Sequence, residues 1–133
     1  MTTAYVGKLV VSYPAIAEVW LIGSRADGSA QHTSDWDYLV VADLITLESL
    51  SATPEFNEPN VDLLVVYDGD NFRKPWRDGD REKHGSLSGW DWKQTSEIEA
   101  HYRATKPRSN DDFYSWVRQG RAVKIYARSG KGM

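Results

Sequence analysis

Three aspartates lie in or beside apolar segments of the chain and could together bind divalent cations. Asp35 and Asp37 come just before the apolar run 38–42, and Asp62 is the only charged residue in the run 61–67. Residues two positions apart on a strand point to the same side, about 6.6 Å apart along the backbone. Two ionised carboxylates so close repel each other, and Mg²⁺ relieves the repulsion because it prefers carboxylate oxygens.

Asp62 would complete this site if its run formed a strand beside the first. Neighbouring strands lie about 4.8 Å apart, and three carboxylates at that spacing can hold two divalent ions, which clamp both reacting oxygens in nucleotidyl transfer. We therefore predict Asp35, Asp37 and Asp62 as metal ligands and catalytic residues. The competing interpretations are that Asp35 and Asp37 are solvated turn residues, and that Asp62 is exposed where a strand begins at the sheet edge.

A glycine–serine turn that begins twelve residues before Asp35 could hold phosphates. Gly23 permits close approach of the backbone, and the N–H groups of a strand-to-helix turn, with the Ser24 hydroxyl, are donors for phosphate oxygens. Gly28 lets the turn fold tightly, and Arg25 adds positive charge. The alternatives are that Ser24 only caps a helix and that Arg25 is a surface residue.

The motif Gly-Ser-x-x-x-Gly, then Ser-Asp-x-Asp, then an aspartate within a later apolar strand resembles the nucleotidyltransferase fold. This fold is shared by DNA polymerase beta, the aminoglycoside nucleotidyltransferases and the minimal nucleotidyltransferases. The resemblance covers about residues 15–67, and the length of the chain suggests the minimal class. It implies an α+β fold, a mixed β-sheet with helices packed mainly on one side. The matching positions are Gly23, Ser24, Gly28, Ser34, Asp35, Asp37 and Asp62.

The resemblance implies an enzyme that transfers a nucleoside monophosphate, AMP from ATP, to a hydroxyl, with pyrophosphate leaving. In the family, the residues at the positions of Asp35 and Asp37 ligate two Mg²⁺ ions. The residue at the position of Asp62 ligates one ion and helps to deprotonate the acceptor. The residues that we predict to bind ATP or another nucleoside triphosphate are Gly23, Ser24, Arg25, Gly28 and Ser34.

The resemblance also implies the kinds of acceptor. In minimal nucleotidyltransferases the acceptor is often a protein, and one known context is an antitoxin that adenylylates a small helical toxin of the HEPN type. Such a partner would have to be a separate chain. A small molecule such as an aminoglycoside is less favoured as the acceptor, because enzymes of that kind usually carry an additional helical domain.

The alternative from another class is a catalytically weak or inactive domain that binds a protein partner or, less favoured, nucleic acid. Asp27 stands before the second glycine, where the family often has a basic residue, and it would oppose a triphosphate. Residues 1–70 carry two basic and eleven acidic residues, a net charge of −9, whereas residues 71–133 carry fourteen basic and eight acidic residues, a net charge of +6. A basic half could meet phosphates or an acidic partner, although scattered solvated charge is the simpler interpretation.

The local patterns predict the elements that must position these residues. Helical spacing predicts helices over 4–13 and 44–50, and N-cap residues at 109–112 predict a final helix through Trp116 that ends at Gly120. The stretch 71–89 is predicted as an exposed loop. The segments predicted as strands are 19–22, 38–42, 61–67, 90–102 and 122–127.

Length and composition limit the remaining possibilities. The 133 residues suit a single domain with one core, 1–133. The absence of cysteine excludes disulfides and thiolate chemistry. No apolar run approaches the roughly 20 residues of a membrane span, so we expect a cytoplasmic, soluble protein with no membrane partner. The histidines show no ligand spacing, and Tyr38, Trp90 or Trp92 could stack on a nucleobase.

Overall fold

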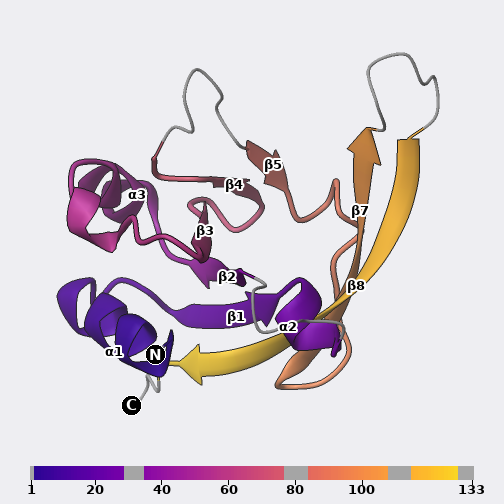
Figure 1. The fold of residues 1–133 in the computed structure, drawn as a ribbon, viewed down its shortest axis with the longest axis horizontal. Helices are drawn as coiled ribbons and strands as arrows, with labels where there is room; N and C mark the ends of the chain where they lie inside the picture. Colours follow the sequence, from indigo (N-terminus) through magenta and orange to yellow (C-terminus); the bar gives the residue numbers. More distant parts are fainter. Residues whose placement is uncertain (1, 29–34, 77–83, 108–114, 129–133) are drawn as a thin grey trace.

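The computed structural model describes residues 2–28, 35–76, 84–107 and 115–128 and contains one sheet (Figure 1). Its strands are β1 (Glu18–Ile22), β2 (Trp36–Val41), β3 (Val61–Val66), β4 (Asn71–Arg73), β5 (His84–Ser86), β6 (Lys93–Gln94), β7 (Glu99–Pro107) and β8 (Ser115–Ala127). The helical elements are α1 (Thr2–Ser12), α2 (Ser24–Asp27), α3 (Leu44–Ser51) and the 3₁₀ turn η1 (Pro54–Phe56). The strand order is β5-β4-β3-β2-β1-β8-β7-β6.

The sheet is mixed because β2 and β3 run parallel while the other described pairs are antiparallel. The segment with α3 and η1 joins the two parallel strands. In their register, Trp36 is opposite Val61 and Asp37 is opposite Asp62. Side chains alternate between the faces of a strand, so this register places the two aspartates next to each other on one face.

The helices cover the other face of the sheet. Leu9 of α1, Leu50 of α3 and Phe56 of η1 share a buried core with Val40 of β2 and Leu63 of β3. The pattern of α1 explains its place, since its buried residues recur at helical spacing and form one apolar face. None of the described helices is long and apolar enough to cross a membrane. The structure confirms the predicted mixed α+β sheet with its helices mainly on one side.

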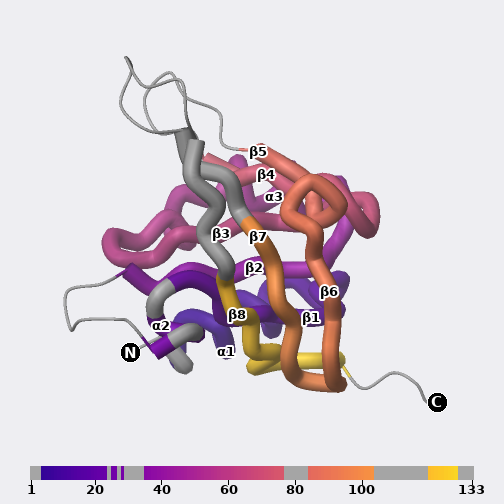
Figure 2. Tube along the Cα trace, turned by 90° about the vertical axis from the view of Figure 1, so that its right-hand side faces the viewer, coloured from indigo at the N-terminus to yellow at the C-terminus, as the bar shows by residue number. Residues whose placement is uncertain are grey.

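The face that carries the aspartates is covered by the second half of the chain. Figure 2 shows β6, β7 and β8 side by side at the end of the sheet. Rings from this region form an aromatic cluster: Trp90 and Trp92 stack on Tyr102, with centroid distances of 5.0 and 5.9 Å, and meet Phe72 and Trp20 edge to face. This cluster buries the part of β2 and β3 that follows the two aspartates.

Most of the predicted elements exist. The helices predicted over 4–13 and 44–50 are α1 and α3, and the strands predicted over 19–22, 38–42 and 61–67 are β1, β2 and β3. The segment 122–127 is the end of β8, which pairs with β1. These elements follow from local apolar patterns bounded by clear turn residues.

The predicted exposed loop at 71–89 is wrong where the structure describes it. The segment contains β4 and β5, and Phe72 and Trp76 are buried, at 2% and 9% exposure. Trp76 donates its indole N–H to the carbonyl of Leu50, at 2.8 Å. The many charged residues of this stretch favour an exposed loop, but tertiary packing buries its two aromatic side chains, Phe72 and Trp76.

The single strand predicted at 90–102 is a hairpin instead. A turn over Leu87–Trp92, in which Asp91 adopts a φ of 53°, leads into β6, and the chain then reverses into β7. Trp90, Trp92 and Tyr102, which the strand prediction placed on one face, are nevertheless in contact, because both tryptophan rings stack on the Tyr102 ring.

The predicted final helix is also wrong. Residues 109–112, whose N-cap pattern suggested it, lie outside the described part of the chain. Residues from Ser115 onward belong to β8, in which Trp116 is opposite Lys106 and Gly120 is opposite Tyr102. β8 satisfies backbone groups on both of its edges, against β7 and β1, and these long-range hydrogen bonds override a weak local helical pattern.

Candidate active site at the Gly23 turn

Asp37 and Asp62 form the centre of the candidate site. They occupy opposing positions of the parallel pair β2–β3, and both are half-buried. The next residues of the same parity, Leu39 and Leu64, are buried in the aromatic face. The two carboxylates therefore lie where this face becomes accessible, at the N-terminal ends of both strands.

Gly23 brings the turn after β1 against Asp37. Its φ is 75°, and a Cβ at this position would overlap Asp37 Oδ2. The close approach agrees with the register, which places Ile22 opposite Asp37. The turn closes into α2 through a hydrogen bond from the Ala26 N–H to the Gly23 carbonyl, at 3.0 Å. Only glycine combines this conformation with this proximity.

The backbone N–H of Gly23 donates to Tyr102 Oη, at 3.0 Å. This N–H is one of the donors that the sequence predicts for phosphate oxygens, so the hydroxyl lies where a phosphate oxygen would be bound. Tyr102 was not among the predicted site residues. Its alternation with Trp90 and Trp92 was the available signal, but only the pairing of β7 with β8, and of β8 with β1, brings it to this turn.

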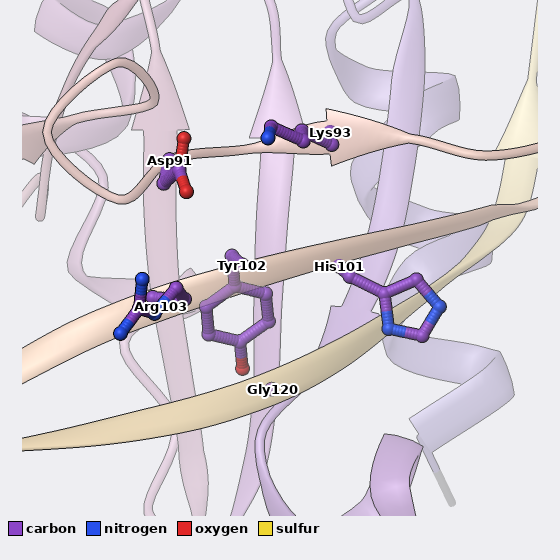
Figure 3. A pocket seen from close by; sticks show the side chains of 6 residues that line it. All are labelled: Asp91, Lys93, His101, Tyr102, Arg103 and Gly120. Carbon is purple, nitrogen blue, oxygen red and sulfur yellow. The ribbon is translucent and has the colours of Figure 1, made fainter.

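Tyr102 also lines an open pocket of about 370 Å³ on β6, β7 and β8 (Figure 3). The lining residues are Asp91, Lys93, His101, Tyr102, Arg103 and Gly120. The Tyr102 ring points toward Gly120, where an added Cβ would overlap it. Lys93 and Arg103 outnumber the one carboxylate, Asp91, so the lining carries a small excess of positive charge.

Lys74 is a second residue that sequence reasoning missed. Its Nζ lies 3.4 Å from Asp62 Oδ1, and the exposed fractions of the two side chains are 19% and 21%. Lys74 directly follows β4, which is antiparallel to β3, so the chain carries it back toward Asp62. The incorrect loop assignment at 71–89 concealed this position.

The other predicted residues are placed as follows. Asp35 is exposed, one residue before β2 begins. Gly28 has a φ of 84°, as a tight turn requires. Ser24 begins α2, and Ser34 lies outside the described residues. The Arg25 guanidinium lies 4.1 Å from the ring centroid of Trp36, a residue whose side chain points away from the face of Asp37.

Tyr38 cannot stack on a nucleobase, so that part of the prediction is wrong. It is 1% exposed and stacks on Tyr5 of α1, with ring centroids 6.1 Å apart. Trp90 and Trp92 are partly exposed but already stack on Tyr102. Tyr38 faces the helical core because it is adjacent to Asp37 along β2, and side chains alternate between the two faces of a strand.

The two carboxylates, Asp37 and Asp62, are groups of the kind that bind a divalent cation. Mg²⁺ commonly binds one or two carboxylates together with substrate phosphates, and Asp37 and Asp62 supply two on neighbouring strands. Within the described ranges, however, no three histidine, aspartate or glutamate side chains lie close enough together to hold a metal ion. The structure thus brings Asp37 and Asp62 together and leaves Asp35 apart from them, and the metal-binding and catalytic roles remain predictions.

Comparisons with known proteins give one structural similarity. The chain resembles the crystal structure of a candidate nucleotidyltransferase from Sulfolobus solfataricus, at 28% sequence identity and a TM-score of 0.43, over 65% of this chain and 75% of that chain. No protein-family model and no curated protein matches the chain. The candidate site is therefore inferred from the residues of this chain alone.

Proposed function

We propose that this chain is a metal-dependent nucleotidyltransferase. It transfers AMP from ATP, or a nucleoside monophosphate from another triphosphate, to a hydroxyl of a protein or small-molecule acceptor. A small helical protein of the HEPN type, encoded as a separate chain, is the proposed partner, with this chain as the antitoxin of the pair. One observation carries the proposal: Asp37 and Asp62 are opposing residues of a parallel strand pair, directly beside the Gly23 turn.

The proposed roles follow from the placement of each group. Asp37 and Asp62 would hold Mg²⁺, which supplies positive charge to the phosphates and to the acceptor oxygen. Asp35 lies apart from this pair in the structure, on the exposed approach to β2, and would have to move toward the ion to become the third ligand. The Gly23 N–H would bind a phosphate oxygen in place of the Tyr102 hydroxyl. Asp62 would accept the proton of the acceptor hydroxyl. The chain itself would contribute alignment of the two substrates, a large factor in reactions of this kind.

The test is transfer of radiolabel from α-labelled nucleoside triphosphates, with magnesium, to proteins of a cell lysate and to candidate small-molecule acceptors. We expect labelling with release of pyrophosphate, and a loss of about a hundredfold or more in Asp37→Asn, the scale seen when one charge-stabilising group is removed. Glu48→Gln, which neutralises an exposed carboxylate of α3, is the matched control and should label as wild type does. Equal labelling by wild type and Asp37→Asn would refute the enzyme.

A second candidate function is a weak or inactive domain that binds a protein partner or nucleic acid. The observation that favours it is that the Gly23 N–H already donates to Tyr102, beside a pocket with excess positive charge. The discriminating measurement is anisotropy of a labelled RNA or DNA oligonucleotide. Electrostatic binding would weaken steeply with added salt, whereas an absence of binding at low salt would exclude nucleic acid and leave the protein partner.

A further inference from the structure

The hydroxyl of Tyr102 occupies a hydrogen-bond donor of the turn that follows β1. The backbone N–H of Gly23 donates to Tyr102 Oη, at 3.0 Å, although the two residues lie 79 positions apart in the sequence. In the proposed function the same N–H binds a phosphate oxygen. An N–H that points at the hydroxyl cannot at the same time make a full hydrogen bond to a ligand, so the hydroxyl and the phosphate compete for it.

The ring of Tyr102 is held in place from several sides. The residue is 5% exposed, and its ring stacks on Trp90 and Trp92 with interplanar angles of 20° and 17°. It also lies against Gly120 of β8, where an added Cβ would overlap the ring (Figure 3). Swinging the ring aside would disrupt both stacks, so the packing fixes the hydroxyl at Gly23.

Strand β8 holds the other end of the same turn. Arg121 Nη1 donates to the carbonyl of Ala26, at 3.0 Å, and the Ala26 N–H donates to the Gly23 carbonyl. Tyr102 and Arg121 therefore contact opposite ends of the turn, but only Tyr102 uses the N–H proposed for phosphate. This difference allows competition for the N–H to be separated from simple support of the turn.

We propose that Tyr102 is an internal competitor of the nucleotide: its hydroxyl takes the place of a phosphate oxygen at the Gly23 N–H and weakens binding of the triphosphate. A phosphate oxygen displaces the hydroxyl because an ionised acceptor makes a hydrogen bond roughly twice as strong as a neutral acceptor does. A ligand without a phosphate has no such advantage, so the contact makes the site selective for anionic ligands. This inference rests on the proposed function for the identity of the ligand.

The experiment measures binding of α,β-methylene ATP, which cannot release pyrophosphate, by isothermal titration calorimetry in buffer with magnesium. Tyr102→Phe keeps the ring and removes only the hydroxyl. We expect this variant to bind the analogue about threefold to tenfold more tightly than wild type does, which is the usual effect of one hydrogen bond. Tyr13→Phe, which loses a hydroxyl bonded to Thr53 in the helical layer, is the matched control and should bind as wild type does.

Arg121→Lys tests whether a loosened turn alone would improve binding. It keeps the positive charge and weakens the contact with Ala26. It should not tighten binding, because Arg121 does not compete for the Gly23 N–H. Equal affinity of Tyr102→Phe and wild type would overturn the proposal, as would a matching gain in Arg121→Lys or an absence of binding by every variant.

A measurement on wild type decides the question if Tyr102→Phe does not fold. The amide resonance of Gly23 in a ¹⁵N-labelled sample should shift when the analogue binds, because its acceptor changes from a neutral hydroxyl to a phosphate. Binding that leaves this resonance unmoved would overturn the proposal. The labelling assay gives a separate result: tighter binding by Tyr102→Phe without any transfer would refute the enzyme and leave the competition at Gly23 standing.

Discussion

At the scale of single residues, Gly23 determines how the two halves of the candidate site meet. Its positive φ turns the chain out of β1, and its missing side chain leaves room for the Asp37 carboxylate. Its N–H reaches Tyr102, which the sequence places far away. Substitution here should therefore affect both the backbone and the carboxylate.

Gly23→Ala should lower the free energy of unfolding more than Gly28→Ala does. Both glycines have positive φ, which costs another residue about 1–2 kcal/mol. Of the two positions, only Gly23 has a described atom that the new Cβ would overlap, since among the described residues nothing lies within 4 Å of the Cβ position at Gly28. Overpacking of this kind adds about 1–3 kcal/mol. Urea unfolding measures both variants, and equal losses would contradict the predicted contact between Gly23 and Asp37.

The sequence was informative about some of these residues and silent about others. The spacing of Asp35 and Asp37, with Asp62 in a later apolar run, predicts that all three carboxylates meet. The register of β2 and β3 places Asp62 opposite Asp37, but Asp35 lies apart from this pair. Lys74 was missed because it follows β4, a three-residue strand that pairs with the neighbouring β3 inside a stretch assigned as a loop. Tyr102 could not be predicted, because it reaches the site through pairing of strands that are distant in the sequence. Local patterns do not encode such pairings.

At the scale of elements, the helices follow local rules and the second half of the sheet does not. α3 begins at a clear N-cap, since Asp43 Oδ1 accepts the Thr46 N–H at 2.8 Å. By contrast, β4, β5 and β6 are each two or three residues long, too short for an alternating pattern to stand out. This difference explains why the first half of the fold was predicted better than the second.

Asp43→Ala should destabilise the protein by about 1 kcal/mol, the usual cost of losing an N-cap, whereas Asp43→Asn should cost little. The side chain and the backbone of Thr46 both hydrogen-bond the Asp43 carboxylate and lower its pKa. Because folding lowers the pKa of Asp43, its ionised carboxylate stabilises the fold at pH values above the ordinary pKa of about 4. This stabilisation is lost as the pH falls through the lowered pKa.

Urea unfolding between pH 7 and pH 3 tests this cap. The difference between wild type and Asp43→Ala should shrink toward the acidic end, and the difference between Asp43→Asn and Asp43→Ala should stay constant there, because the amide does not titrate. If the difference in unfolding free energy between wild type and Asp43→Ala stays constant from pH 7 to pH 3, the role of the ionised carboxylate is refuted.

At the scale of the whole molecule, the acidic first half and the basic second half are paired with each other. Lys74 contacts Asp62, and Lys124 Nζ of β8 lies 3.2 Å from Glu18 Oε2 of β1. Glu18 also accepts the Trp20 indole N–H, at 2.8 Å. Some of the opposite charges of the two halves therefore pair within the sheet and stabilise it, and these residues are not available to bind an outside partner.

A double-mutant cycle on Glu18→Gln and Lys124→Met should give a coupling energy of about 1 kcal/mol, within the range for contacting residues. The Lys124 side chain is 14% exposed and that of Glu18 is 31% exposed, which favours a larger value than a solvated surface pair gives. The coupling should fall as NaCl is added. Additive effects of the two single variants, measured by urea unfolding, would argue against this link between the halves.

The position of β1 has a consequence for synthesis of the protein. One edge of β1 pairs with β2, which follows soon after it in the chain. The other edge pairs with β8, where Glu18 is opposite Ala127, and the Arg128 side chain donates to the Ile16 carbonyl. A nascent chain that has emerged from the ribosome only as far as β7 thus exposes an unfinished strand in the middle of its future sheet. Open edges of this kind recruit other chains, so release from the ribosome before the last strand is made should leave fragments that aggregate.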